Sequence, residues 1–197
     1  MASFTPLPST TGATPSDADL LDRAREGDRW AFQRLVERYE DQVAATVIGM
    51  LGRGADADDV GQETFIRFYR ALDQFRGEAS LGTYLTRIAI NQSLMALRKK
   101  TRWYDRFLSR DDATGPRAEP SLDGDATVDR RERAALVHEA LATLSDDHRA
   151  VVVLRLLNGY STRETAAMLD IPEGTVMSRL HRATNQLEDV LKPLLRV

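Results

Sequence analysis

The sequence predicts an all-α protein made of two small helical domains joined by a flexible acidic linker. Apolar residues recur at spacings of three and four over most of the chain, which is the spacing of one buried helix face. No stretch alternates apolar and polar residues as a half-buried strand would. Residues 1–16 and 109–127 are poor in large apolar residues, so we expect them to form a disordered tail and a linker.

The composition limits the kinds of function that the chain can have. Its 197 residues, 42% of them hydrophobic, are enough for one large domain or two small ones. The absence of cysteine excludes disulfides and thiolate metal sites, and the three histidines do not sit at ligand spacing, so no cofactor is expected. The net charge of -3 argues against general polyanion binding but allows local basic patches.

The N-terminal sequence has no basic start and no apolar run, so it does not resemble a signal peptide. No segment approaches the roughly 20 apolar residues that a membrane-spanning helix needs. We therefore expect a cytoplasmic protein.

The first domain, residues 17–108, is predicted to hold four helices. Ser16 is placed to cap a short helix. A longer amphipathic helix follows over residues 28–51, a third begins near Asp56, and Ser80 is placed to cap the fourth. The pattern is typical of a four-helix domain.

The second domain, residues 128–197, begins with one amphipathic helix. Ser145 is placed to cap the next, over residues 146–157. Ser161 and Glu164 have capping-box spacing at the start of a short helix, and the "IPEG" turn then leads to the last helix. A short helix, a tight turn and a second helix predict a helix-turn-helix, whose second helix enters the major groove of DNA.

The last helix has an apolar stripe and an opposite face of short polar and cationic side chains. The polar face carries Ser178, His181, Arg182 and Asn185. These side chains suit base edges and phosphates, because Arg can bind guanine with two hydrogen bonds. Phosphate contacts are expected from Arg155, Ser161 and Thr162. The alternative is a plain helical hairpin with a solvated polar face.

An acidic face with an apolar residue inside it is predicted on the third helix. It is formed by Asp59, Gln62, Glu63 and Ile66. This combination suits docking to a basic helix of another protein. Two alternatives remain: the acids only complement the helix dipole, or they belong to a carboxylate cluster that binds a metal.

The fourth helix carries an aromatic, an amide and cations along one face. They are Tyr84, Arg87, Asn91 and Arg98, and more cations with two aromatics follow in "RKKTRWYDR". Aromatic rings stack on unpaired bases and cations bind phosphates, so this face suits single-stranded nucleic acid. Alternatively, the basic end compensates the helix dipole and Tyr84 belongs to the core.

Three stretches together resemble the extracytoplasmic-function (ECF, group IV) sigma factors of bacterial RNA polymerase. They are "LLDRAREGDRWAFQRLVERY", "DADDVGQETFIRFYRALDQFRGEASLGTYLTRIAINQSLMALRKK" and "LATLSDDHRAVVVLRLLNGYSTRETAAMLDIPEGTVMSRLHRATNQLEDVL". The resemblance covers both helical domains. It implies a non-enzymatic protein that binds core RNA polymerase, recognises promoter DNA and helps to melt it.

The resemblance assigns the first domain to sigma region two. It implies that Asp59, Gln62 and Glu63 bind the clamp helices of the polymerase's largest subunit. It also implies that "FRGEA" and the following helix melt and read the −10 element, where Asn91 helps to hold a flipped-out base. Tyr84 stands where the family usually has Trp, so the stacking ring is smaller.

The resemblance assigns the second domain to sigma region four, which reads the −35 element. The contacts that it implies are Thr175, Met177, Ser178, His181 and Arg182 for the recognition helix, and Arg155 and Ser161 for phosphates. Met177 replaces a frequent Arg, so the −35 sequence of relatives cannot be transferred. Gly61 replaces a β-branched residue and lowers helix stability by up to about 1 kcal/mol relative to Ala.

The resemblance also implies an anti-sigma factor as a partner. Two other functions remain as alternatives. The first is a free-standing helix-turn-helix regulator that dimerises through the first domain, which would not need the acidic face. The second is a metal hydrolase built on Asp56, Asp58, Asp59 and Glu63.

Overall fold

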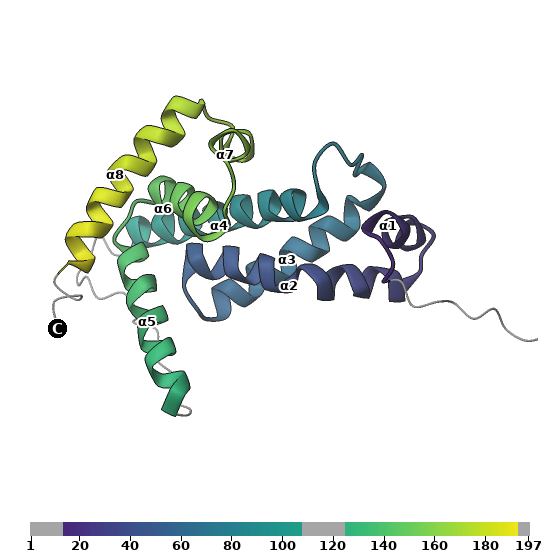
Figure 1. The fold of residues 1–197 in the computed structure, drawn as a ribbon, viewed down its shortest axis with the longest axis horizontal. Helices are drawn as coiled ribbons and strands as arrows, with labels where there is room; N and C mark the ends of the chain where they lie inside the picture. The colour runs from purple at the N-terminus through teal and green to yellow at the C-terminus, as the bar shows by residue number, and fades with distance from the viewer. Residues whose placement is uncertain (1–13, 108–124, 193–197) are drawn as a thin grey trace, which may run out of the picture. The chain divides into compact units, whose positions relative to one another are not determined.

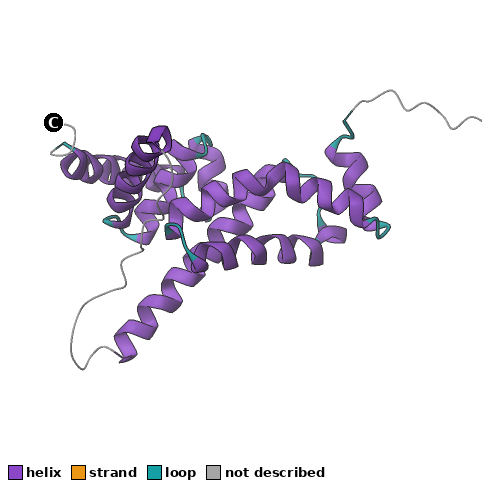
Figure 2. Ribbon diagram, turned by 90° about the horizontal axis from the view of Figure 1, so that it is seen from below, coloured by secondary structure: helices purple, strands orange, loops and turns teal. Residues whose placement is uncertain are grey.

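The computed structural model describes residues 14–107 and 125–192, and helices are the regular elements of these ranges (Figures 1 and 2). The predicted all-α class is confirmed. Most of the expected tail and linker, residues 1–13 and 109–124, lies outside the described residues. No helix in the described part of the chain is long and apolar enough to span a bilayer.

The chain forms two compact units, residues 1–38 and 39–197, which are described separately. The first unit contains α1 (Asp17–Arg25) and the beginning of α2 (Arg29–Leu51). The predicted cap of α1 is confirmed as a capping box, because Ser16 Oγ accepts the Asp19 N–H at 3.2 Å and the Asp19 carboxylate accepts the Ser16 N–H at 3.1 Å.

The second unit begins with the rest of α2 and continues through α3 (Ala55–Arg70), the short 3-10 helix η1 (Leu72–Gln74) and α4 (Leu81–Phe107). The predicted cap of α4 is confirmed, since Ser80 Oγ accepts the Thr83 N–H at 3.1 Å. Helices α3 and α4 pack against each other, so residues on both can converge on one site.

The remaining helices are α5 (Asp125–Ala142), α6 (Asp146–Val152), the π-helix η2 (Val153–Leu157), α7 (Thr162–Leu169) and α8 (Glu173–Leu191). Residues 125–127 were expected in the linker but are helical. The linker-like composition of these residues conceals the start of the helix.

The prediction of one α-helix over residues 146–157 is wrong in its last turn. The N–H of Asn158 bonds the carbonyl of Val153 at 2.9 Å, five residues back, which widens the helix into a π turn. Gly159, with a φ of +75°, then turns the chain toward α7. The periodicity of apolar residues does not distinguish this wider turn from an α-helical one.

The predicted helix-turn-helix is confirmed in α7 and α8. Ser161 Oγ accepts the Glu164 N–H at 3.2 Å, and the Glu164 carboxylate accepts the Ser161 N–H at 2.8 Å, which completes the predicted capping box. Val176 and Ala183 of the apolar stripe are fully buried. The opposite face of α8 therefore remains outside the core.

Candidate nucleic-acid interface

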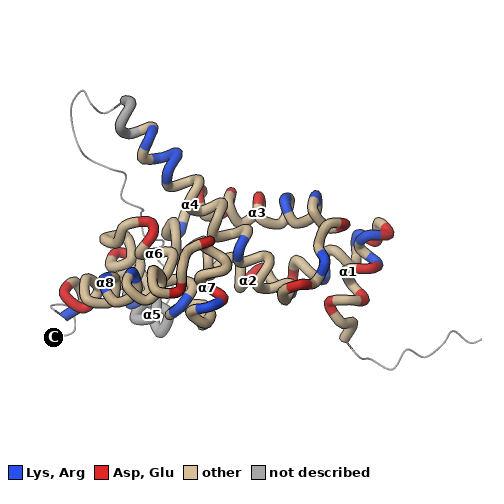
Figure 3. Tube along the Cα trace, turned by 90° about the horizontal axis from the view of Figure 1, so that it is seen from above, with Lys and Arg blue, Asp and Glu red and all other residues tan. Residues whose placement is uncertain are grey.

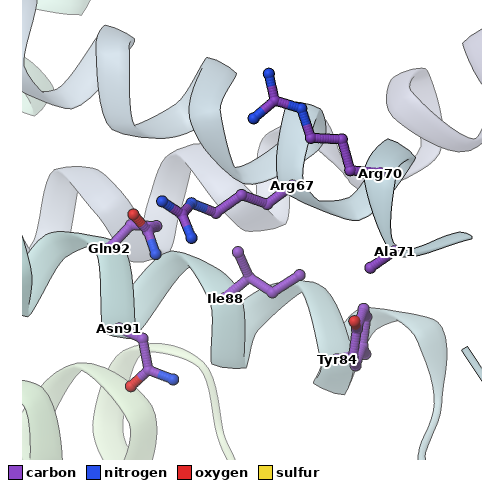
Figure 4. A pocket seen from close by; sticks show the side chains of 7 residues that line it. All are labelled: Arg67, Arg70, Ala71, Tyr84, Ile88, Asn91 and Gln92. Carbon is purple, nitrogen blue, oxygen red and sulfur yellow. The ribbon is translucent and has the colours of Figure 1, made fainter. Parts of the chain in front are cut away.

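A pocket of about 400 Å³ lies between α3 and α4 (Figure 4). Its walls come from the C-terminal end of α3 and the first half of α4, and consist of Arg67, Arg70, Ala71, Tyr84, Ile88, Asn91 and Gln92. Two of the four residues predicted to bind a strand, Tyr84 and Asn91, thus line one hollow. The other two, Arg87 and Arg98, are exposed on the same helix but do not line it.

Tyr84 belongs both to the core and to the pocket. Its ring centroid lies 5.0 Å from that of Phe75 and 6.2 Å from that of Phe68, with tilted and edge-on geometry. The side chain is only partly buried and lines the pocket. The two interpretations of this residue are therefore compatible, since packing against two Phe rings holds the tyrosine ring in place at the pocket wall.

Arg67 and Arg70 also line the pocket, although no pattern in the sequence indicated them. They lie three residues apart in the last turn of α3, and their side chains are exposed (Figure 4). Arg67 forms an ion pair with Glu63 at 2.7 Å. Two cations beside an aromatic ring and an amide give the pocket the chemistry to bind an anionic, aromatic ligand.

Acidic residues occur along α3 (Figure 3), and the face predicted from them lies at the surface. Asp59, Gln62 and Ile66 are exposed, and Glu63 is half-buried. Val60 and Thr64, which alternate with these residues along α3, are buried on the other side of the helix. Ile66 is 44% exposed, so an apolar side chain lies at the surface beside carboxylates. Among the described residues, no group of three His, Asp, Glu or Cys could hold a metal ion.

The polar face of α8 is exposed as its pattern predicts. Ser178, His181, Arg182 and Asn185 are all exposed, and Met177 is 64% exposed. Arg182 makes no hydrogen bond or ion pair with any residue that the structure describes. Its guanidinium is thus available to an external acceptor.

Short contacts within α8 orient part of this face. Ser178 Oγ donates to the carbonyl of the half-buried Thr175 at 3.1 Å, which leaves the lone pairs of the hydroxyl free to accept. The Asn185 amide nitrogen lies 3.4 Å from His181 Nε2. The face therefore offers donors and acceptors in fixed positions.

Two contacts anchor α8 to α6 and to the turn that precedes α6. Arg179 pairs with Asp147 of α6 at 2.7 Å, and Gln186 Nε2 donates to the Thr143 carbonyl at 2.9 Å. The helical pattern alone did not indicate either contact. Because they lie on the flanks of α8, they fix the helix without using its exposed polar face.

The residues expected to contact phosphates differ in exposure and in the hydrogen bonds that they already make. The exposed Ser161 hydroxyl accepts the Glu164 N–H within its capping box and hydrogen-bonds the Glu164 carboxylate. Thr162 is half-buried. Arg155 donates from one terminal nitrogen to the Tyr160 carbonyl, and its Nε is buried without a hydrogen-bond partner, so part of its guanidinium is already committed.

Glu164 adds a negative charge close to Arg155. Hydrogen bonds from the Ser161 side chain and backbone, helped by the charge of Arg155, hold the pKa of Glu164 below its usual value. The ionised carboxylate thus belongs to the cap of α7.

Two protein-family models match the chain in order. Sigma-70 region 2 matches residues 35–103, and Sigma-70, region 4 matches residues 134–187. The pocket and the acidic face lie within the first match, and the exposed face of α8 lies within the second.

Curated relatives match almost the whole chain. The ECF RNA polymerase sigma-E factor of Escherichia coli (strain K12) is 35% identical over 92% of this chain and 97% of its own length. The RNA polymerase sigma-H factor of Pseudomonas aeruginosa is 35% identical over 91% of this chain and 96% of its own.

Two solved structures are similar to this chain. CnrH, solved in complex with the cytosolic domain of CnrY, has a TM-score of 0.62 and 28% identity, and covers 90% of this chain and 97% of its own. The sigma factor RpoE of Bartonella quintana, solved in complex with the anti-sigma factor NepR, has a TM-score of 0.62 and 26% identity. That match covers 82% of this chain and 96% of the other.

Proposed function

This chain belongs to the ECF sigma factors of bacterial RNA polymerase, and from that membership we propose how its residues divide the work of initiation. It is an alternative sigma factor that binds core polymerase and DNA and directs promoter recognition and transcription initiation. It is not an enzyme. Both the free-standing regulator and the metal hydrolase are therefore set aside.

The acidic face of α3 is the proposed surface for core polymerase. Asp59, Gln62 and Glu63 provide charge and hydrogen bonds, and Ile66 provides an exposed apolar contact beside them. A basic partner helix with an apolar residue would complement all four. The proposed partner is the clamp-helix region of the largest polymerase subunit.

The pocket between α3 and α4 is the proposed site for one unpaired base of the −10 element. A base that leaves the stack can lie against Tyr84 and present its edge to Asn91. Arg67 and Arg70 can neutralise the neighbouring phosphates, and Arg87 and Arg98 extend this charge along α4. Capture of a base in this way favours the melted promoter.

The exposed face of α8 is the proposed reader of the −35 element in the major groove. Arg182 can bind guanine, Ser178 and His181 can reach base edges, and Thr175 supports this face from its partly buried position. Met177 can contact a thymine methyl group but cannot donate to guanine. Ser161, with the free N–H groups of Arg155, is proposed to bind the flanking phosphates.

The proposed domain boundaries are residues 17–108 and 128–197, joined by residues 109–127. The cytoplasm is the proposed location, because core polymerase and promoters are there. An anti-sigma factor is a proposed partner, since the related RpoE of Bartonella quintana was solved with one.

The pocket is the observation that carries this proposal, because it unites an aromatic ring, an amide and two cations in one hollow. The test is transcription in vitro with sigma-free bacterial core polymerase and a pool of genomic fragments, followed by sequencing of the transcript starts. Discrete starts that share two upstream elements at fixed spacing are expected. Starts that depend on only one element would contradict the assignment of two DNA-reading sites.

A further inference from the structure

Met95 is an apolar side chain at the surface of α4, one helical turn beyond the pocket. It is 56% exposed, whereas Ala89 and Ser93, which face the interior, are fully buried. A single exposed apolar residue is normal at a protein surface and needs no explanation by itself. Met95 differs from such a residue because it lies beside the pocket and on a positively charged face of the helix.

Met95 lies on the same face of α4 as the pocket residues. Four residues follow one another at spacings of four, three and four, which places them along one side of an α-helix; they are Tyr84, Ile88, Asn91 and Met95. Gln92 of the pocket wall (Figure 4) contacts Met95, since its Nε2 lies 3.9 Å from Met95 Sδ. The thioether thus extends the wall of the pocket toward the C-terminal end of α4.

The same face is positively charged beyond Met95. Arg98, Lys99 and Arg102 lie three, four and seven residues further on, and all three side chains are exposed. None of them forms a hydrogen bond or ion pair with any residue that the structure describes. No Asp or Glu occurs between Leu81 and Trp103 of α4. This face therefore suits a polyanion that also has apolar surfaces, which is the chemistry of a nucleic-acid strand.

The distance along α4 matches the spacing of nucleotides. Asn91 and Met95 are four residues apart, which corresponds to about 6 Å of helix axis. Successive nucleotides of a stacked strand are about 3.4 Å apart, so this distance corresponds to one or two nucleotide steps. A strand with one base in the pocket therefore brings another base to Met95.

We propose that these residues form a second nucleotide subsite, in which Met95 packs on the face of a base close to the captured one. Arg98, Lys99 and Arg102 bind the phosphates that follow. Proteins bind single strands by combining contacts to base faces with cations along the backbone, and a thioether packs favourably against aromatic rings. The subsite rests on the proposed −10 function of the pocket.

The subsite adds affinity for the melted strand without reading its sequence. Every base has a π-face, so packing on that face does not depend on the identity of the base. The unbranched side chain of Met95 has three rotatable bonds and adapts to purines and pyrimidines. We therefore expect the second position to require a base but to tolerate any of the four.

The test measures binding of the holoenzyme to a single-stranded −10 oligonucleotide in which one base at a time is removed to leave an abasic sugar. Its sequence is taken from the promoters found by transcription in vitro. Wild-type holoenzyme should lose affinity when the captured base is removed, and also at one further position within two nucleotides of it. Met95→Ala should weaken binding of the intact strand about two- to tenfold and abolish the loss at the second position alone. Tyr84→Ala should abolish the loss at the first position.

Val137→Ala is the matched control, because it removes apolar atoms from a position of α5 that is 42% exposed and should leave these affinities unchanged. Met95→Leu should retain most of the affinity, since Leu keeps an apolar side chain of similar volume. Arg102→Gln should reduce the magnitude of the negative salt slope by about 0.7, whereas Met95→Ala should leave the slope unchanged. Thermal unfolding of each variant checks that the fold is intact.

The outcomes separate the subsite from the proposed function. No binding of the intact strand by wild-type holoenzyme overturns both. Binding that depends on Tyr84 but is unchanged in Met95→Ala overturns the subsite alone, and it leaves this face of α4 to an acidic protein segment with apolar residues. A Met95→Ala protein that binds weakly but still requires the second base also overturns the subsite, because the lost affinity then does not come from packing on that base.

Discussion

Arg67 Nε lies 2.7 Å from Glu63 Oε1, one turn apart on α3, and this ion pair joins the acidic face to the wall of the pocket. Both side chains are partly exposed, and exposed pairs at this spacing contribute only about 0.3–0.5 kcal/mol. A basic partner could therefore replace Arg67 as the ion-pair partner of Glu63 at little cost in free energy. Arg67 would then be released from this pair, and it belongs to the pocket that we propose for the −10 strand.

Arg67→Gln should weaken binding of the holoenzyme to a single-stranded −10 oligonucleotide. The slope of log affinity against log salt concentration is negative, and loss of one phosphate contact should reduce its magnitude by about 0.7. Titrations at several salt concentrations measure this slope. Arg163→Gln, the same change at an exposed position of α7, is the control, and an equal loss of slope in both variants would remove Arg67 from the strand site.

Tyr84→Ala should reduce binding of the same oligonucleotide by about 1–3 kcal/mol, because a stacked base is lost. Tyr84→Phe should retain most of the affinity, since it keeps the ring and its packing on Phe68 and Phe75. Thermal unfolding of each variant separates loss of stacking from loss of the fold. Equal binding by the wild-type and Ala variants would exclude a stacking role.

Glu63→Arg should abolish binding to core polymerase and leave DNA-reading residues intact. The new cation would repel a basic partner, and it would lie beside Arg67. Affinity for core polymerase measured by fluorescence anisotropy checks this outcome. Glu139→Arg makes the same charge change at an exposed position of α5 and should bind normally.

Arg182→Ala should reduce −35-dependent transcription while core binding persists. One bidentate contact to guanine contributes about 1–3 kcal/mol of discrimination against other bases. The variant should therefore transcribe promoters in which this guanine is substituted as well as promoters that keep it. Transcription from a set of −35 variants provides the measurement. Lys192→Ala, which removes a cation paired with Glu188 at the end of α8, serves as the control.

Glu164→Gln should remove part of the pH dependence of unfolding. The folded pKa of Glu164 is lowered, so its contribution is present above the unfolded pKa and is lost as the pH falls through the folded pKa. Melting temperatures of both proteins between neutral pH and pH 3 should therefore converge in acid. A constant difference across this range would mean that the carboxylate contributes no charge-dependent stability to the cap.

The sequence alone predicts the N-terminal caps of several helices and the buried face of α8, because these signals act over one or two helical turns. Ser16, Ser80 and Ser161 each accept the backbone hydrogen bond that their position predicts. The apolar stripe of α8 is buried at Val176 and Ala183 for the same reason, since every third or fourth residue lies on one face. The exposed polar face of α8 follows directly from that stripe.

Only the tertiary structure decided which distant residues meet. Arg67 and Tyr84 line one pocket because α3 packs on α4, and no local pattern encodes that crossing. Arg149 is buried although it is charged, because it bonds to carbonyls at two helix ends, one of them 99 residues away. Local periodicity reports which face of a helix is buried, whereas the identity of the covering residue depends on packing between segments far apart in the chain.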